Sequence, residues 1–290
     1  MTRPVRRRRA CRAAGVAVMA LLVASSCGVS GDTDHADKGA AGEGRRARLA
    51  LAPRGGGSVD RDALEDAAQI IEGRLAAAGV SDAKVTVGGR RVVVDLRNDE
   101  DVEVVTAFVT TRAVLTFRPV LEQLEATDQR ASAALGQLDG EAADHLGDDP
   151  TKEAILVGRF NQTGDGRDQG RPIYRVGPAL VSGDTVETAT ASDDVGRWVV
   201  LPVLKPGPEG IDRFNEATTK CWSRSEECPL GSLAVVLDGE VLMVPEIQAP
   251  SYERDQIQLS GAFGKREAQR IAISLRFGAL PLQFEVQRER

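Results

Sequence analysis

The chain has 290 residues, of which 42% are hydrophobic and 4% aromatic, so we expect a core built mainly from Val, Leu, Ile and Ala. That length allows one large domain or two smaller ones. Residues 1–26 hold six of the 37 basic residues and none of the 43 acidic ones, so without them the formal charge falls from −6 to −12. This acidic balance argues against nucleic acid as a partner.

The first 26 residues have the pattern of a signal peptide. Arginines precede a 12-residue apolar stretch from Ala13 to Ala24, which is too short to span a bilayer. Residues 23–27, VASSC, resemble a bacterial lipobox, in which the cysteine becomes the lipid-modified first residue of the mature chain, although Ala24 replaces the usual leucine. We predict a lipoprotein attached through Cys27 to the extracytoplasmic face of the cell membrane. The alternative is an ordinary cleaved signal with an incidental Cys27.

Residues 27–45 are rich in Gly, Ala and Asp, which predicts a disordered tether between the lipid and the fold. Of the four cysteines, Cys11 is expected to be removed with the signal peptide and Cys27 to carry the lipid. Thiols oxidise outside the membrane, so the other two, Cys221 and Cys228, are expected to form a disulfide. Six residues separate them, and no histidine or second cysteine pair accompanies them to complete a zinc site. Two unpaired thiols are the alternative.

Residues 46–120 alternate between strand and helix patterns. Apolar and polar residues alternate at 47–51, 85–87, 92–96 and 114–120, and helical spacing covers about 60–78 and 98–112. The resulting order, β-α-β-β-α-β, is that of a ferredoxin-like split unit. We therefore predict an α+β fold whose ferredoxin-like base begins with 46–120.

Residues 121–177 form a polar, weakly periodic insertion, in which 123–138 suits a solvated helix and the remainder a loop. Order returns in 178–262, the predicted head subdomain, with a strand at 198–204, a helix near 211–222 and a hairpin around Asp238-Gly239. Trp222 continues the helical spacing and is expected in the core rather than as a binding platform. For Asp238, turn chemistry is a sufficient role.

The last segment, 263–287, predicts a helix followed by a strand. Helical spacing places four apolar residues on one face of 265–277: Ala268, Ile271, Ala272 and Leu275. Gly278 and Pro281 end the helix, and 282–286 alternate as a strand. Because these two elements cannot enclose a core alone, we expect both to pack on the sheet of 46–120, with 178–262 inserted as a head on two connections.

Fragments spread along the chain resemble the first extracytoplasmic (P1) domain of SecD, a membrane subunit that assists Sec-dependent protein export. They are A-x-x-II-x-x-R-x-x-x-x-GV (67–80), G-x-x-VVVDL (89–96), A-x-LTFRPV (113–120), LAVVLDGEVLMVPEIQAP (233–250) and SGAF…GALP (260–281). The resemblance covers about 46–120 and 178–286. It implies a base made from both ends of the segment, a P1 head subdomain between them, and a head that engages the emerging preprotein while base and head change orientation.

The resemblance favours an accessory in Sec-dependent export that binds unfolded or emerging polypeptides, with the exported polypeptide and the Sec translocon as partners. The sequence contains no transmembrane bundle, so coupling of proton flow to motion is not expected of this chain by itself. The alternative is the same fold used as a receptor or interaction lipoprotein for another cell-envelope partner or a small ligand. A broad apolar groove would favour peptide binding, and a small closed pocket a ligand.

An enzyme is not expected. The sequence offers no paired carboxylates, Ser/His/Asp arrangement, metal-ligand set or phosphate loop, and its two histidines, His35 and His145, lie in the tether and the insertion. We therefore assign no catalytic residue, no cofactor and no metal site.

Overall fold

The computed structural model describes residues 47–54, 59–80, 82–97, 102–125, 128–131, 133, 149–159 and 171–289. All of them lie in one compact unit, Gly42–Arg290. The predicted signal peptide, Cys27 and the tether therefore lie outside the described residues. Within the described part of the chain, no helix combines the length and apolar character needed to cross a membrane.

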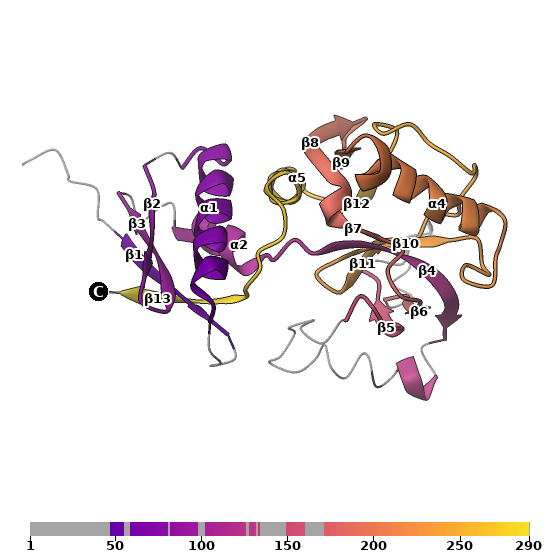
Figure 1. Ribbon diagram of the computed structural model, residues 1–290, viewed down its shortest axis with the longest axis horizontal. Helices are drawn as coiled ribbons and strands as arrows, with labels where there is room; N and C mark the ends of the chain where they lie inside the picture. Colours follow the sequence, from indigo (N-terminus) through magenta and orange to yellow (C-terminus); the bar gives the residue numbers. More distant parts are fainter. Residues whose placement is uncertain are drawn as a thin grey trace, which may run out of the picture. The chain divides into compact units, whose positions relative to one another are not determined.

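Four antiparallel strands form the base sheet, in the order β13-β1-β3-β2. They are β1 (Ala47–Pro53), β2 (Lys84–Gly88), β3 (Arg91–Leu96) and β13 (Phe284–Glu289). Helices α1 (Arg61–Ala77) and α2 (Val102–Thr110) lie beside this sheet (Figure 1). The core between the sheet and the helices contains Leu49 and Val94 from the strands and Ile71 and Val105 from the helices. The α+β class with antiparallel sheets is thus confirmed.

One strand that the sequence predicted for the base sheet, at 114–120, lies in another sheet, whereas the closing strand predicted within 263–287 does lie in the base sheet. Residues 115–120 belong to β4 (Leu115–Leu124), which pairs with strands of a different sheet. Instead, β13 lies beside β1, in register from Arg48 opposite Glu289 to Pro53 opposite Phe284. Every residue from Leu115 to Val120 is buried, so this strand requires cover on both faces. In β13, by contrast, buried Phe284 is followed by exposed Glu285.

β4 is the central strand of a six-stranded sheet in the order β11-β10-β4-β6-β5, with β7 also paired to β4. The other strands are β5 (Ala154–Val157), β6 (Ile173–Val176), β7 (Val181–Ser182), β10 (Leu233–Leu237) and β11 (Glu240–Met243). The prediction of helix and loop for 121–177 was therefore wrong for its described strands. β5 and β6 have four residues each, too few to show a clear period in the sequence.

A third sheet has three strands in the order β12-β9-β8. Its strands are β8 (Val186–Asp194), β9 (Arg197–Leu204) and β12 (Leu259–Phe263), and helices α4 (Ile211–Trp222) and α5 (Lys265–Phe277) accompany it. One apolar cluster, the head core, includes Val200 and Leu259 of this sheet, Phe117 of β4 and Phe214 of α4. This cluster joins the three-stranded sheet to the six-stranded one.

Helix α5 corrects the prediction for the closing segment. Its apolar face, from Ala268 to Leu275, lies in the head core with Ala189 of β8, not against the base sheet. Both α5 and β8 carry small alanines here, which allows a helix to approach a strand closely. Partly buried Ile273, on another side of α5, packs against the base core. The two halves of 263–287 thus separate, because β13 joins the base sheet whereas α5 mainly completes the head core.

Candidate functional site

A cavity of about 880 Å³ lies among the end of α1, α2, β8 and α5. On the side of α1 and α2 its lining is mainly apolar, with alanines together with Val104 and Phe108. On the side of α5 the lining includes the polar Gln269 and the charged Arg266 and Arg270 beside apolar Ile273. The cavity therefore combines apolar surface with hydrogen-bond donors.

The strand β8 borders this cavity with three consecutive residues, Ala189, Thr190 and Ala191. Successive side chains of a strand point to opposite faces, so a cavity that touches three in a row touches the edge of the strand and not one face alone. β8 is the terminal strand of its sheet. The cavity is therefore bounded in part by an open sheet edge.

A cluster of charged side chains lies at the first turn of α5. Glu267, which also lines the cavity, accepts a hydrogen bond from Arg159, whose Nη2 lies 2.8 Å from Oε2 of Glu240. The guanidinium carbon of Arg159 is 5.8 Å from the ring centroid of Phe263. Burial acts to lower the pKa of Arg159, but Glu240 and Glu267 outweigh it and raise the pKa above its ordinary value. This network fixes the first turn of α5 beside the cavity.

A buried arginine, Arg74 of α1, holds the connections between the base sheet and the rest of the fold. Its two terminal nitrogens donate to the carbonyls of Phe108 (2.9 Å), Thr111 (2.7 Å), Arg112 (3.1 Å) and Gly278 (2.5 Å). Burial lowers the pKa of Arg74 to about 10, opposed by the Asp238 carboxylate, so the side chain remains charged at neutral pH. The connections themselves are joined, since the amide of Leu280 donates to the carbonyl of Arg112.

Asp238 has a wider role than the predicted hairpin turn. Its carboxylate accepts hydrogen bonds from the amides of Ala113 (3.1 Å) and Val114 (2.8 Å). Its own φ is 51°, in the left-handed region that Asp and Asn tolerate better than other non-glycine residues. Ala113 also has a positive φ, 62°. Asp238 thus fixes an unusual backbone where the chain passes from α2 to β4.

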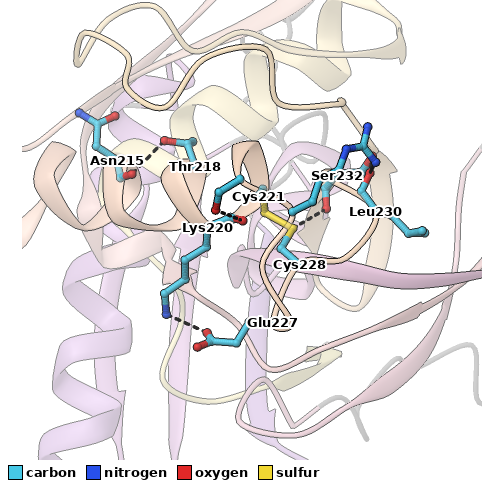
Figure 2. The surroundings of a disulfide bond; sticks show 10 residues. Asn215, Thr218, Lys220, Cys221, Glu227, Cys228, Leu230 and Ser232 are labelled. Carbon is cyan, nitrogen blue, oxygen red and sulfur yellow. Dashed lines mark hydrogen bonds and ion pairs between the residues drawn. A yellow bond between two sulfur atoms is a disulfide. The ribbon is translucent and has the colours of Figure 1, made fainter.

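The structure joins Cys221, at the end of α4, to Cys228 in the loop that follows. Figure 2 shows this bond together with the nearby ion pair between Lys220 and Glu227, whose atoms Nζ and Oε2 are 2.7 Å apart. Both half-cystines are fully buried in the head core. The disulfide therefore anchors the end of α4, and neither of its cysteines lines the cavity.

The expectation that Trp222 lies in the core was wrong. The tryptophan is 53% exposed, whereas the buried face of α4 contains Phe214, Ala217, Thr218 and Cys221. Adjacent helical residues differ by about 100° around the axis, so Trp222 points away from the face that contains Cys221. It does not line the cavity.

Residues 159–282 match the family model described as SecDF, P1 head subdomain. This region is SecDF-like. Among the relatives, Protein translocase subunit SecDF of Thermus thermophilus is 29% identical over 228 residues, which are 78% of this chain and 27% of that protein. Protein translocase subunit SecD of Streptomyces coelicolor is 30% identical over 165 residues, or 56% of this chain and 25% of that protein.

Solved structures agree with the resemblance that the sequence fragments indicated. A structure of SecDF described as a membrane component that enhances protein export is 27% identical, with a TM-score of 0.58, and the match covers 84% of this chain and 99% of that one. SecDF in a super-membrane-facing form gives a TM-score of 0.59 at 27% identity, over 83% of this chain and 29% of that one. The chain spans about a quarter of the length of the SecDF of Thermus thermophilus and the SecD of Streptomyces coelicolor.

Sequence reasoning missed the open edge of β8 and the two buried arginines of the SecDF-like fragments. Arg74 and Arg118 stood in the quoted fragments, but a charged residue gives no sign in the sequence that it will be buried. Arg118 of β4 donates to the carbonyls of Gly177 (2.7 Å) and Lys152. Within the described residues, no group of three or more His, Cys, Asp or Glu side chains is arranged to hold a metal ion.

Proposed function

We propose that the chain is a membrane-anchored extracytoplasmic binding module that assists Sec-dependent protein export by holding unfolded or emerging polypeptides. The observation that carries the proposal is the match of residues 159–282 to the SecDF P1 head subdomain. Relatives with this region are named as protein translocase subunits. The partners that we propose are the exported polypeptide and the Sec translocon, and we propose no catalytic activity.

The domain arrangement of this proposal is a ferredoxin-like base that carries an inserted head. The base sheet has the order β13-β1-β3-β2, with two helices beside it, which supports the first part. The chain leaves the base after α2 and returns at β13, which supports the second.

For the anchor, we propose a signal peptide at 1–26, lipid on Cys27 and a tether at 27–45. The support is the order of basic, apolar and small residues before the cysteine. Metabolic labelling with a fatty acid should mark the wild-type chain and not the Cys27→Ser variant. A variant that carries as much label as the wild type would contradict lipidation at this residue.

A second function, binding of a small ligand, is favoured by one observation. The cavity volume of about 880 Å³ is within the range of small-molecule sites, roughly 300–1,000 Å³. Charged Arg266 and Arg270 would then orient a polar group of the ligand. This alternative predicts saturable binding of a small molecule and no capture of polypeptides.

Site-specific photocrosslinking in cells distinguishes the two functions. A photoreactive amino acid replaces Thr190, an exposed threonine on β8 that lines the cavity. The matched control replaces Thr86, an exposed threonine on β2, the terminal strand of the base sheet, which does not line the cavity. We expect Thr190 to capture a range of exported chains during secretion and Thr86 to capture few.

Two results would count against the polypeptide function. Equal capture at the two positions would mean that the crosslinks report general proximity. Absence of exported chains at Thr190, combined with normal expression of the variant, would leave the small-ligand function as the better explanation.

A further inference from the structure

The hairpin between β8 and β9 determines which backbone groups of β8 face away from the sheet. Its turn is Val195-Gly196, both with positive φ (51° and 81°), and the flanking pair is Asp194 opposite Arg197. The residues that flank such a two-residue turn form a hydrogen-bonded pair, and the pairs then alternate along the ladder. Thr190 therefore bonds to β9, whereas Ala189 and Ala191 have their N–H and C=O groups on the open edge.

The two alanines at the open edge are the same ones that line the cavity. Among the described residues, no hydrogen bond from outside the sheet reaches their backbone groups. Natural sheets usually protect an open edge with Lys, Pro or a bulge. The run from Thr188 to Ser192 has no charge and no proline, and its register with β9 is regular.

The surroundings of this edge suit the side chains of an added strand. The side chain of buried Ala189 lies on the face that packs with α5, and Thr190 on the opposite face is exposed. Beyond the edge, the cavity has apolar Val104 and Ile273. Arg270 also lines the cavity, and its guanidinium adds hydrogen-bond donors to a lining that is otherwise largely apolar near this edge. Acidic Glu187 and Asp193 flank the uncharged run.

We propose that an extended segment of an unfolded polypeptide binds in this cavity as an antiparallel strand added to β8, paired with the backbone of Ala189 and Ala191. Residues directly opposite in a sheet share a face, so the ligand residues that pair with these alanines point their side chains toward α5 and the apolar wall. The opposite face of the sheet, which carries the side chain of Thr190, is exposed to solvent. The site therefore recognises backbone and alternation of apolar and polar residues, not a fixed sequence. This inference rests on the proposed polypeptide-binding function.

The test uses the wild-type chain and a fluorescent peptide of alternating Val and Thr with a lysine at each end, followed by fluorescence anisotropy. Two further peptides carry N-methyl groups, one on every Val amide and the other on every Thr amide. In the proposed pairing the Val residues face the apolar wall, and their amides bond to β8. Val methylation should weaken binding by roughly tenfold or more, through lost hydrogen bonds and a steric clash, and Thr methylation by less than about threefold.

Two variants test the protein side of the same contact. Ala191→Pro removes an edge N–H, and proline is compatible with such a position because the ladder to β9 does not use that donor. Ala191→Val adds similar bulk and keeps the N–H. We expect a loss of roughly five- to tenfold for proline and a change within about twofold for valine, at matched melting temperatures.

The outcomes separate this inference from the proposed function. Equal weakening by the two methylated peptides, or the reverse order, would overturn the pairing with β8. The proposed function would still stand if Thr190 captured exported chains. Failure of the unmethylated peptide to bind, with no capture at Thr190, would refute both. Dimerisation of the chain that is abolished by Ala191→Pro, with no peptide bound, would assign the edge to a second copy and overturn the inference.

Discussion

Replacing Arg74 by methionine should destabilise the fold more than any change to an exposed arginine. The guanidinium is fully buried and donates to four backbone carbonyls, three of them in or just after the last turn of α2 and one at Gly278. The final carbonyls of a helix have no partner within the helix, so Arg74 acts as the cap of α2. Methionine keeps much of the apolar stem and removes all four donors.

The magnitude follows from the groups left without partners. A hydrogen bond from a charged donor contributes about 1.5–3 kcal/mol, but four of them share one side chain whose own burial is costly, so the contributions do not add. Three of the carbonyls are partly accessible and can recover water. We expect a loss of about 3–5 kcal/mol in the free energy of unfolding. Arg74→Lys keeps the charge but not the planar fork and should lose roughly half as much.

The matched control is Arg61→Met in the same helix. Arg61 is 80% exposed and pairs with Glu65 one turn later, which predicts a much smaller loss of stability than for Arg74→Met. Denaturant unfolding measures both variants, and hydrogen exchange at Val114 and Leu280 should accelerate in the Arg74 variant alone. If Arg74→Met lost no more stability than Arg61→Met, the interpretation of Arg74 as the residue that joins the two connections would be wrong.

Three other changes test the rest of the structure. Asp238→Ala removes both carboxylate acceptors and places alanine at a positive φ, so the free energy of unfolding should fall by about 2–4 kcal/mol. Asp238→Asn should lose roughly 1 kcal/mol, and denaturant unfolding measures both variants. Replacing Cys221 and Cys228 together by serine should lose about 2 kcal/mol, because the closed loop is short; two free thiols titrating in the unreduced wild type would contradict the bond. Hydrogen bonds from Arg130 and then Arg175 lower the pKa of Glu122 in the folded chain. Ionised Glu122 therefore stabilises the fold at pH values above its ordinary pKa of 4.5, and this contribution is lost as the pH falls through the lowered pKa of the folded state. Unfolding midpoints measured against pH should show this acid loss in the wild type and less of it in Glu122→Gln, and identical profiles would refute the assignment.

Local patterns in the sequence were sufficient to predict most helices and strands but not their partners. The strand pattern at 114–120 is correct, and its assignment to the base sheet is not, because alternation does not reveal which sheet a strand enters. A strand buried on both faces, as β4 is from Leu115 to Val120, indicates a central position. The sequence predicted that the closing strand joins the base sheet, but nothing local in it indicates that β13 lies beside β1.

The same limit applies to α5 and Trp222. The apolar face of α5 was identified correctly, but small residues such as Ala268 and Ala272 fit any closely packed partner, and the partner is β8. Trp222 is one residue beyond Cys221, and this single step around the helix decides between core and solvent. For the candidate site, the sequence supplied the SecD resemblance, whereas the open edge depends on strand order, which requires the three-dimensional fold.

The position of β13 has a consequence for the order in which the chain can fold. One edge of β1 pairs with β3, which follows about 40 residues later in the chain. Its other edge pairs with β13, residues 284–289, near the end of the chain. During synthesis, the first strand is therefore available long before its last partner, while the intervening residues can already assemble their own sheets. Until then the exposed side of β1 is open to wrong pairing, which charged Arg48 and the following Pro53 at its ends help to limit. Because the pairing of β1 with β13 joins residues far apart in the sequence, closure of the base should be slower than pairing of neighbouring strands such as β2 and β3.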